Sequence, residues 1–291
     1  MGYDRQMFGR ERPTSVVCPS CGSLVGIKDE RCLICGRARP GLFGLAPLLR
    51  LLGQDAGFVA VVMWACGALY IATLAVDSRS MEASGLLSFL SPSNKAIFLF
   101  GASGALPVFR LGRWWTVLSA GWLHGGVVHI AFNMMALRDL GPLTAHLYGT
   151  ARTVIVYTVA SVVGFLASSA VGYYLPFLPI LRGGVVMTVG ASASLFGLIG
   201  ALLYYGRRGG SRALRDAAAR WALGGLAFGF FVPGIDNWAH MGGLAGGYLA
   251  ARWLDPWLPE RGDHVLIALV CLLLSAAAVI ASVVVGLPPG T

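Results

Sequence analysis

Long apolar runs separated by short polar segments dominate the chain after residue 55. A helix needs about 20 apolar residues to cross a bilayer. By that measure the pattern predicts seven membrane-spanning helices, at about 56–76, 126–143, 153–173, 185–205, 216–232, 236–254 and 264–286. The connection between the first two is long and unusually apolar, and its stretch RWWTVLSAGWLH holds three tryptophans, which favour the membrane–water interface. We expect this connection to dip partly into the membrane.

Composition agrees with a membrane protein. Hydrophobic residues make up 56% of the chain and charged residues only 12%, whereas soluble domains carry roughly 25% charged residues. The net charge of +9 would suit a nucleic-acid partner, but most of the positive charges fall in the segments between the spans. They read better as orientation signals. The sequence therefore predicts an all-α polytopic membrane protein and makes nucleic acid an unlikely partner.

The distribution of Lys and Arg predicts the orientation. With the N-terminus inside, 17 of the 22 basic residues lie on the cytoplasmic side, Arg152 among them, and five lie outside. Such a split follows the positive-inside rule. We expect a bacterial inner (plasma) membrane protein with a cytoplasmic N-terminus and an external C-terminus.

Residues 1–40 read as a separate small module. CPSCG and CLICG place Cys18, Cys21, Cys32 and Cys35 in two C-x₂-C knuckles. Four thiolates at this spacing suit structural, tetrahedral Zn²⁺. The alternative, a pair of disulfides, needs an oxidising compartment, which conflicts with the predicted cytoplasmic location. Residues 41–55, beginning GLFGLAPLLRLLG, read as a linker or interfacial segment before the membrane domain at 56–286.

Candidate chemistry gathers at one depth of the membrane. In the predicted orientation, Ser192, His240 and the pair His129 and Asn133 lie on three different spans, all in the outer half. Polar groups inside spans are costly and usually functional. A serine becomes a nucleophile when a histidine takes its proton, and a tetrahedral intermediate then needs hydrogen-bond donors. His129 and Asn133 are four apart and share a helix face, and the Ser192 N–H adds a further donor if a helix begins there.

Glycines would bring the two key helices together. One set lines the span of Ser192 and a second lines the span of His240: Gly190, Gly197, Gly200, Gly242, Gly243, Gly246 and Gly247. Small residues at such spacings let helices approach closely in a membrane. A hydrogen bond between Ser192 and His240 requires that close approach.

Three motifs carry a resemblance to a known family. GASASLFGLIGA, DNWAHMGG and RWWTVLSAGWLHGGVVHIAFNM are similar, in this order, to the serine span, the histidine span and the first loop of rhomboid intramembrane serine proteases. The resemblance covers about residues 56–286. It implies a rhomboid-like six-helix core plus one extra C-terminal helix. It also implies a Ser192–His240 dyad without a third carboxylate and without a catalytic cofactor. His129, Asn133 and the Ser192 N–H form the implied oxyanion hole, and His124 is implied to be structural.

Three positions depart from the family pattern. Ala193 stands where glycine is common in the family. Alanine is also small, so the helix remains narrow at this turn. Thr116 replaces an arginine in the first loop, so an anchor is missing there. Ala145 replaces a structural glutamate near the inner end of the second span.

Two neighbouring residues compete for catalytic roles. Ser194 is two residues beyond Ser192 and would face away from it in a helix, so we expect it to pack. Asp236 lies close before His240 and reads as a helix cap rather than a triad acid.

The sequence predicts an intramembrane serine endopeptidase that cleaves single-span membrane proteins near the outer face of the bilayer. The alternative is a non-catalytic rhomboid-like scaffold that binds membrane clients. A transporter would need charges paired at mid-membrane or an inverted repeat, and the sequence has neither.

Overall fold

The computed structural model describes residues 15–18, 21–26, 29–37, 57–76, 90–175, 186–258 and 260–286. The chain divides into two units, Met1–Ala56 and Gly57–Thr291. The predicted linker or interfacial segment at 41–55 lies outside the described residues.

The N-terminal unit contains a small antiparallel hairpin. Strand β1 (Ser15–Val17) pairs with β2 (Leu24–Gly26), with Val17 opposite Leu24. Gly22 and Gly36, each directly after the second cysteine of a knuckle, have φ of 75° and 71°. Glycine adopts this left-handed backbone without strain. The two knuckles therefore turn tightly, as their sequences predict.

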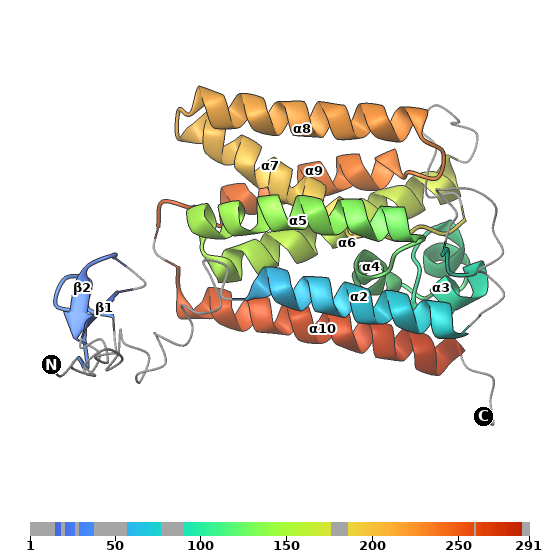
Figure 1. The fold of residues 1–291 in the computed structure, drawn as a ribbon, viewed down its shortest axis with the longest axis horizontal. Helices are drawn as coiled ribbons and strands as arrows, with labels where there is room; N and C mark the ends of the chain where they lie inside the picture. Colours follow the sequence, from blue (N-terminus) through green and yellow to red (C-terminus); the bar gives the residue numbers. More distant parts are fainter. Residues whose placement is uncertain are drawn as a thin grey trace, which may run out of the picture. The chain divides into compact units, whose positions relative to one another are not determined.

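In the residues that the structure describes, the regular elements of the second unit are all helices, apart from one isolated β-bridge between Ser103 and Thr188, which confirms the predicted all-α class (Figure 1). Its helices are α2 (Phe58–Val76), α3 (Asn94–Phe100), η3 (Leu106–Arg110), α4 (Thr116–Ser119), η4 (Ala120–Trp122), α5 (Val127–Tyr148), α6 (Thr150–Tyr174), α7 (Ser192–Arg208), α8 (Arg212–Phe231), α9 (Asn237–Trp253) and α10 (Gly262–Gly286). Each predicted span corresponds to one of the long helices. The apolar connection before α5 holds four short helices rather than irregular backbone alone.

Among the described helices, α2, α6 and α10 are long and apolar enough to cross a membrane. The other four predicted spans are shorter or more polar. Helices α7 and α9 have 17 residues each, while α5 and α8 carry charged side chains. The most apolar helices are thus not the ones that carry the candidate chemistry.

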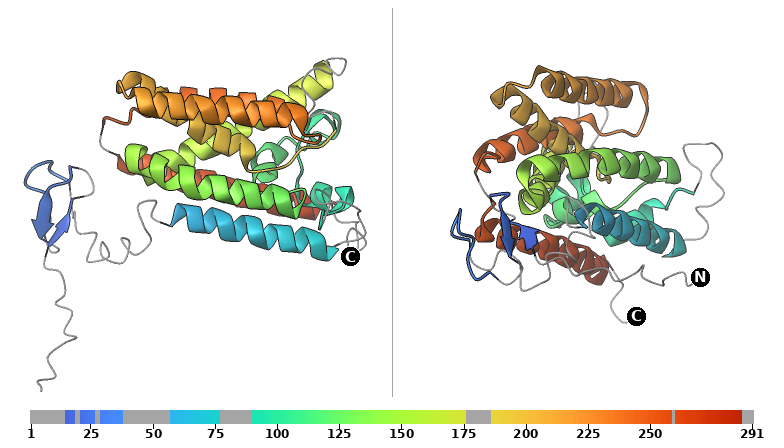
Figure 2. Two further views of the ribbon diagram at one scale, coloured as in Figure 1. Left: turned by 45° about the horizontal axis from the view of Figure 1, so that its top comes forward. Right: turned by 60° about the vertical axis from the view of Figure 1, so that its left-hand side comes forward.

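Helices α6, α7 and α9 pack at the centre of the bundle. A Cβ at Gly247 of α9 would overlap the backbone of Gly197 on α7, and one at Gly243 would overlap the carbonyl of Ala193. The helices therefore touch through their backbones, as the glycine spacing predicts. Helix α8 lies at one edge, packed on α7, and α10 lies at the opposite edge (Figures 1 and 2).

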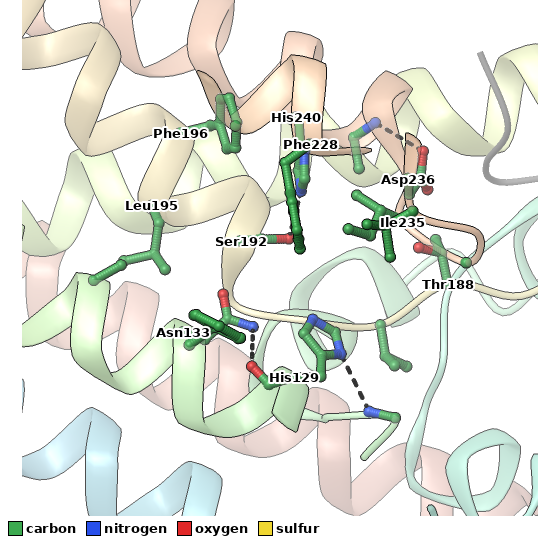
Figure 3. Close-up of a pocket in the computed structure, with 18 of the residues that line it drawn as sticks. His129, Asn133, Thr188, Ser192, Leu195, Phe196, Phe228, Ile235, Asp236 and His240 are labelled. Atoms are coloured by element: carbon green, nitrogen blue, oxygen red, sulfur yellow. Dashed lines mark hydrogen bonds between the residues drawn. The ribbon is translucent and has the colours of Figure 1, made fainter. Parts of the chain in front are cut away.

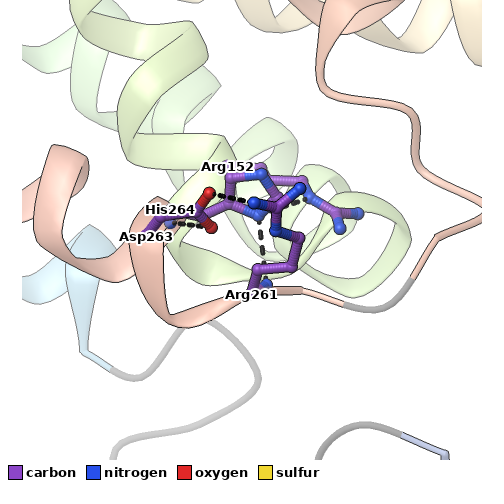
Figure 4. Close-up of polar contacts among 4 residues, drawn as sticks. All are labelled: Arg152, Arg261, Asp263 and His264. Atoms are coloured by element: carbon purple, nitrogen blue, oxygen red, sulfur yellow. Dashed lines mark hydrogen bonds and ion pairs between the residues drawn. The ribbon is translucent and has the colours of Figure 1, made fainter.

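Arg152 is a buried structural residue at the connection between α9 and α10. At the start of α6 it is 2% exposed and donates to the carbonyls of Asp255 (3.1 Å) and Leu258 (2.8 Å) and to Nδ1 of His264 (3.2 Å; Figure 4). It thereby fixes the connection between α9 and α10. The neighbouring pair of Arg261 and Asp263 is exposed, and such surface pairs contribute little stability.

Candidate active site

Ser192 and His240 meet at the first turns of α7 and α9. The Oγ of Ser192 lies 2.8 Å from Nε2 of His240, within hydrogen-bond distance (Figure 3). Ser192 is the first residue of α7, seven residues later than the predicted start of that span, because residues 186–191 approach it without helical structure. Ser192 therefore stands at a helix N-terminus, where backbone N–H groups lack intrahelical acceptors.

Asp236 caps α9 and does not support the imidazole. Its carboxylate accepts from the N–H of Ala239 (3.0 Å) and from the hydroxyl of Ser168. Nδ1 of His240 has no hydrogen-bond partner among the described residues. The imidazole instead stacks on Phe196, with ring centroids 4.2 Å apart and an interplanar angle of 12°. The ring is thus held by Phe196 and Ser192, with no carboxylate at Nδ1.

His129 and Asn133 lie beside this pair on α5. Nδ1 of His129 accepts from the N–H of Gly125 (3.4 Å), which assigns the ring proton to Nε2. A Cβ at Gly190 would come within 2.7 Å of Nε2, so the ring lies against the backbone that leads to Ser192. Asn133 uses one N–H to bind the carbonyl of His129 (3.0 Å), which leaves its amide a second one. Both side chains can therefore donate toward the space beside Ser192.

His124 and Ser194 lie behind the site. His124 is fully buried, with its ring centroid 5.2 Å from that of His129. Ser194 is also fully buried, and its Oγ has no hydrogen-bond partner in the part of the chain described. Neither side chain lines the cavity next to Ser192.

A cavity of about 1130 Å³ opens beside the pair. Ser192, His240, His129 and Asn133 supply polar atoms to its lining, and α5, α7 and α8 supply apolar walls. Phe132 of α5 and Phe228 of α8 pack against each other at the edge of this cavity, with ring centroids 6.4 Å apart, and are 60% and 53% exposed. The ring pair thus joins α5 to α8 beside the site, and the cavity behind it is lined mainly by apolar side chains.

The four N-terminal cysteines form a cluster that could bind a metal ion. Their sulfurs all lie within 4.8 Å of one another, with Cys18 and Cys35 3.7 Å apart and Cys21 and Cys32 3.6 Å apart. A tetrahedral site with metal–sulfur bonds of about 2.3 Å places its sulfurs about 3.8 Å apart, so the donors fit. A disulfide needs about 2.05 Å.

The fold and the site together define a helical membrane protein with a hydrogen-bonded Ser–His pair at an apolar cavity. The Rhomboid domain matches residues 111–256, about half of the chain, and the chain therefore belongs to the rhomboid family. This confirms the family predicted from its three motifs, and the protein is an integral membrane protein.

The chain is similar to several curated relatives. It is 34% identical over 192 residues to the Rhomboid protease GluP of Bacillus subtilis (strain 168), covering 65% of this chain and 35% of GluP. It is 30% identical over 164 residues to RHOMBOID-like protein 4 of Arabidopsis thaliana, covering 55% of this chain and 39% of the relative. The chain thus spans well under half the length of these relatives.

Proposed function

We propose that the protein is an intramembrane serine endopeptidase with Ser192 as nucleophile and His240 as general base. The observation that carries this proposal is the 2.8 Å contact between Ser192 Oγ and His240 Nε2 at the cavity. A serine needs such a base because its hydroxyl is a weak nucleophile while protonated. Membership of a family with protease-named members supports the same reaction.

The geometry suggests how each group acts. His240 takes the Ser192 proton as Oγ attacks the scissile carbonyl, and then gives that proton to the departing amine. Water attacks the resulting acyl-serine ester in the second half of the reaction, with His240 again as base. The side chains of His129 and Asn133 and the N–H of Ser192 stabilise the negative oxygen. Each such donor contributes roughly 2.7–4 kcal/mol in serine hydrolases.

The substrate we propose is a single-span membrane protein. The apolar cavity walls on α5 and α8 suit a membrane segment, which would enter between these helices by separating the contacting rings of Phe132 and Phe228. A peptide must unwind before its carbonyl can be attacked, because helical carbonyls are already hydrogen-bonded. Gly or Pro near the cleaved bond makes that unwinding easier.

The charge distribution supports a location and an orientation. With 17 of 22 basic residues on the N-terminal side of the membrane, the N-terminus lies in the cytoplasm of a bacterium and the C-terminus lies outside its inner membrane. Ser192 then lies in the outer half of the bilayer, and cleavage takes place near the outer face. We assign residues 1–40 to a cytoplasmic ribbon, 41–55 to the linker and 56–286 to the protease domain.

The test is cleavage of a single-span substrate in proteoliposomes, with the products identified by mass spectrometry. We expect one cut near the outer end of the substrate helix, and slower cleavage when Gly and Pro residues around that site are replaced by leucine. A substrate that binds but stays intact would contradict the protease and support a client-binding scaffold.

We also propose that the cysteine cluster holds one structural Zn²⁺. The donor set and the sulfur separations support it. A module of this size buries little apolar surface, so metal binding would supply much of its folding free energy. Four protein ligands fill a tetrahedral shell, which leaves the metal a structural role and leaves catalysis to the membrane domain without a cofactor.

Elemental analysis of the purified full chain should find one zinc per molecule. Cys32→Ser should lose the metal, because Cys32 is buried in the cluster and is one of its four ligands. Cys271→Ser is the matched control, since Cys271 lies on α10 outside the cluster, and it should retain the zinc. A zinc-free wild-type protein, or equal loss from both variants, would refute the site.

A further inference from the structure

The C-terminal part of α10 is hydrogen-bonded to the segment that precedes α4. Arg113 donates from Nη2 to the carbonyl of Ser282 (2.8 Å), and Trp115 donates from Nε1 to the Ser282 hydroxyl (3.0 Å). Arg113 is 4% exposed, Ser282 is fully buried, and the guanidinium lies 4.5 Å from the ring centroid of Phe98. Arg113 also donates from Nη1 to the carbonyl of Phe98 (3.4 Å), so two carbonyls and an aromatic face hold the buried guanidinium in place, and breaking these contacts would leave buried N–H groups without acceptors.

Thr116, which stands where the family pattern has an arginine, is linked to this contact. Thr116 is buried and donates its hydroxyl to the carbonyl of Arg113 (2.7 Å). The buried guanidinium in this loop is thus that of Arg113, three residues before Thr116. The carbonyl that accepts its hydrogen bond belongs to Ser282 on α10, the extra C-terminal helix.

A first series of hydrogen bonds and chain connections links α10 to the nucleophile Ser192. Helix α4 continues directly into η4, and the carbonyl of Ala120 in η4 accepts from the N–H of Gly190 (3.0 Å). Gly190 lies two residues before Ser192, with φ of 135°. A displacement of Trp115 would thus move Ala120 and, through one backbone hydrogen bond, the turn that presents Ser192.

A second path reaches the same turn. Ser119 of α4 donates to the carbonyl of Gly101 (2.7 Å), and Gly101 is packed so closely on Ser282 that a Cβ there has no room. Two residues later, Ser103 exchanges both backbone hydrogen bonds with Thr188, at 3.1 and 2.7 Å. Both paths begin at Ser282 and end in residues 186–191.

We propose that Ser282, Arg113 and Trp115 are positioning residues for Ser192, so that the extra helix α10 serves catalysis without touching the substrate. The inference rests on the proposed protease function. Its physical basis is the narrow range of about 2.6–3.2 Å within which His240 can take the serine proton. Misplacement of reacting groups by about 1 Å can cost ~10²-fold in rate.

The test compares variants that remove one hydrogen bond with variants that leave it intact. Trp115→Phe and Ser282→Ala each remove the bond between Nε1 and Oγ. Trp114→Phe changes the adjacent tryptophan, which is 66% exposed. Ser275→Ala removes another buried serine of α10, whose hydroxyl bonds within its own helix to Cys271 (2.9 Å).

The readouts are the rate at which a fluorophosphonate probe labels Ser192, kcat and KM for a single-span substrate, and the melting temperature. We expect the first two variants to lower labelling and kcat about tenfold with KM unchanged, as a sub-ångström displacement would. The two controls should stay within about twofold. The double variant Trp115→Phe/Ser282→Ala should have the same labelling rate and kcat as either single variant, because the two substitutions remove the same hydrogen bond.

Labelling and kcat that stay within twofold in Trp115→Phe and Ser282→Ala would overturn the inference and leave the protease proposal intact. Equal losses in Ser275→Ala would also overturn it, since they would show a general effect of α10 on stability. A wild-type protein that neither cleaves nor is labelled at Ser192 would overturn the protease proposal itself, and the inference with it.

Discussion

Ser192→Ala is expected to abolish proteolysis while leaving the fold intact. The change removes the hydroxyl oxygen that lies 2.8 Å from His240 Nε2, and without it no acyl-enzyme can form. Removing the nucleophile of a serine hydrolase lowers kcat by a factor on the order of 10⁶. The measurement is cleavage of a single-span substrate in proteoliposomes, with melting temperature as the check on folding.

Ser194→Ala is the matched control, because it removes a hydroxyl from the same helix two residues later. Ser194 Oγ is buried and away from the cavity, so we expect activity within a few fold of wild type. Cleavage that survives in Ser192→Ala would rule out the mechanism. If fluorophosphonate labelling were lost in Ser194→Ala but kept in Ser192→Ala, the nucleophile would be Ser194 and not Ser192.

Local spacing explains why so much of this site could be predicted. The H-x₄-H-x₃-N pattern places His129 and Asn133 on one face of α5, and the glycines of α7 and α9 predict the approach that brings Ser192 to His240. The first relation is set within one helical turn, and the second follows from small residues repeated along each of the two helices. The structure brings together all four side chains that the sequence selects.

Long-range contacts explain what the sequence left out. Arg113 and Ser282 are 169 positions apart, and no periodicity links an arginine in a loop to a serine in an apolar helix. The sequence places Arg152 between two spans, among the charges that set the orientation, but it does not show that this side chain donates to carbonyls of the α9–α10 connection. The start of α7 was placed too early because the apolar run continues through residues 186–191, and hydrophobicity alone does not show where a helix begins.

The contact between α7 and α9 predicts the second large effect, a loss of stability on Gly247→Ala. A Cβ at Gly247 would overlap the carbonyl and the Cα of Gly197. Backbone cannot rotate away as a side chain can, so the two helices must separate. Overpacking typically costs 1–3 kcal/mol, and with two backbones in contact we expect at least about 3 kcal/mol. Helices in a membrane associate largely through such packing, so the melting temperature of the purified protein should fall by roughly 6–12 °C.

Activity should fall with stability, because Ser192 and His240 lie on the same two helices and their 2.8 Å contact depends on the separation of those helices. Gly67→Ala is the matched control. It adds the same methyl group inside α2, where no atom lies within 4 Å of the new Cβ, and replacing glycine in a helix contributes up to about 1 kcal/mol of stability. Its melting temperature should equal or exceed that of wild type. If Gly247→Ala melts and cleaves like Gly67→Ala, then backbone contact between α7 and α9 does not hold the catalytic pair together.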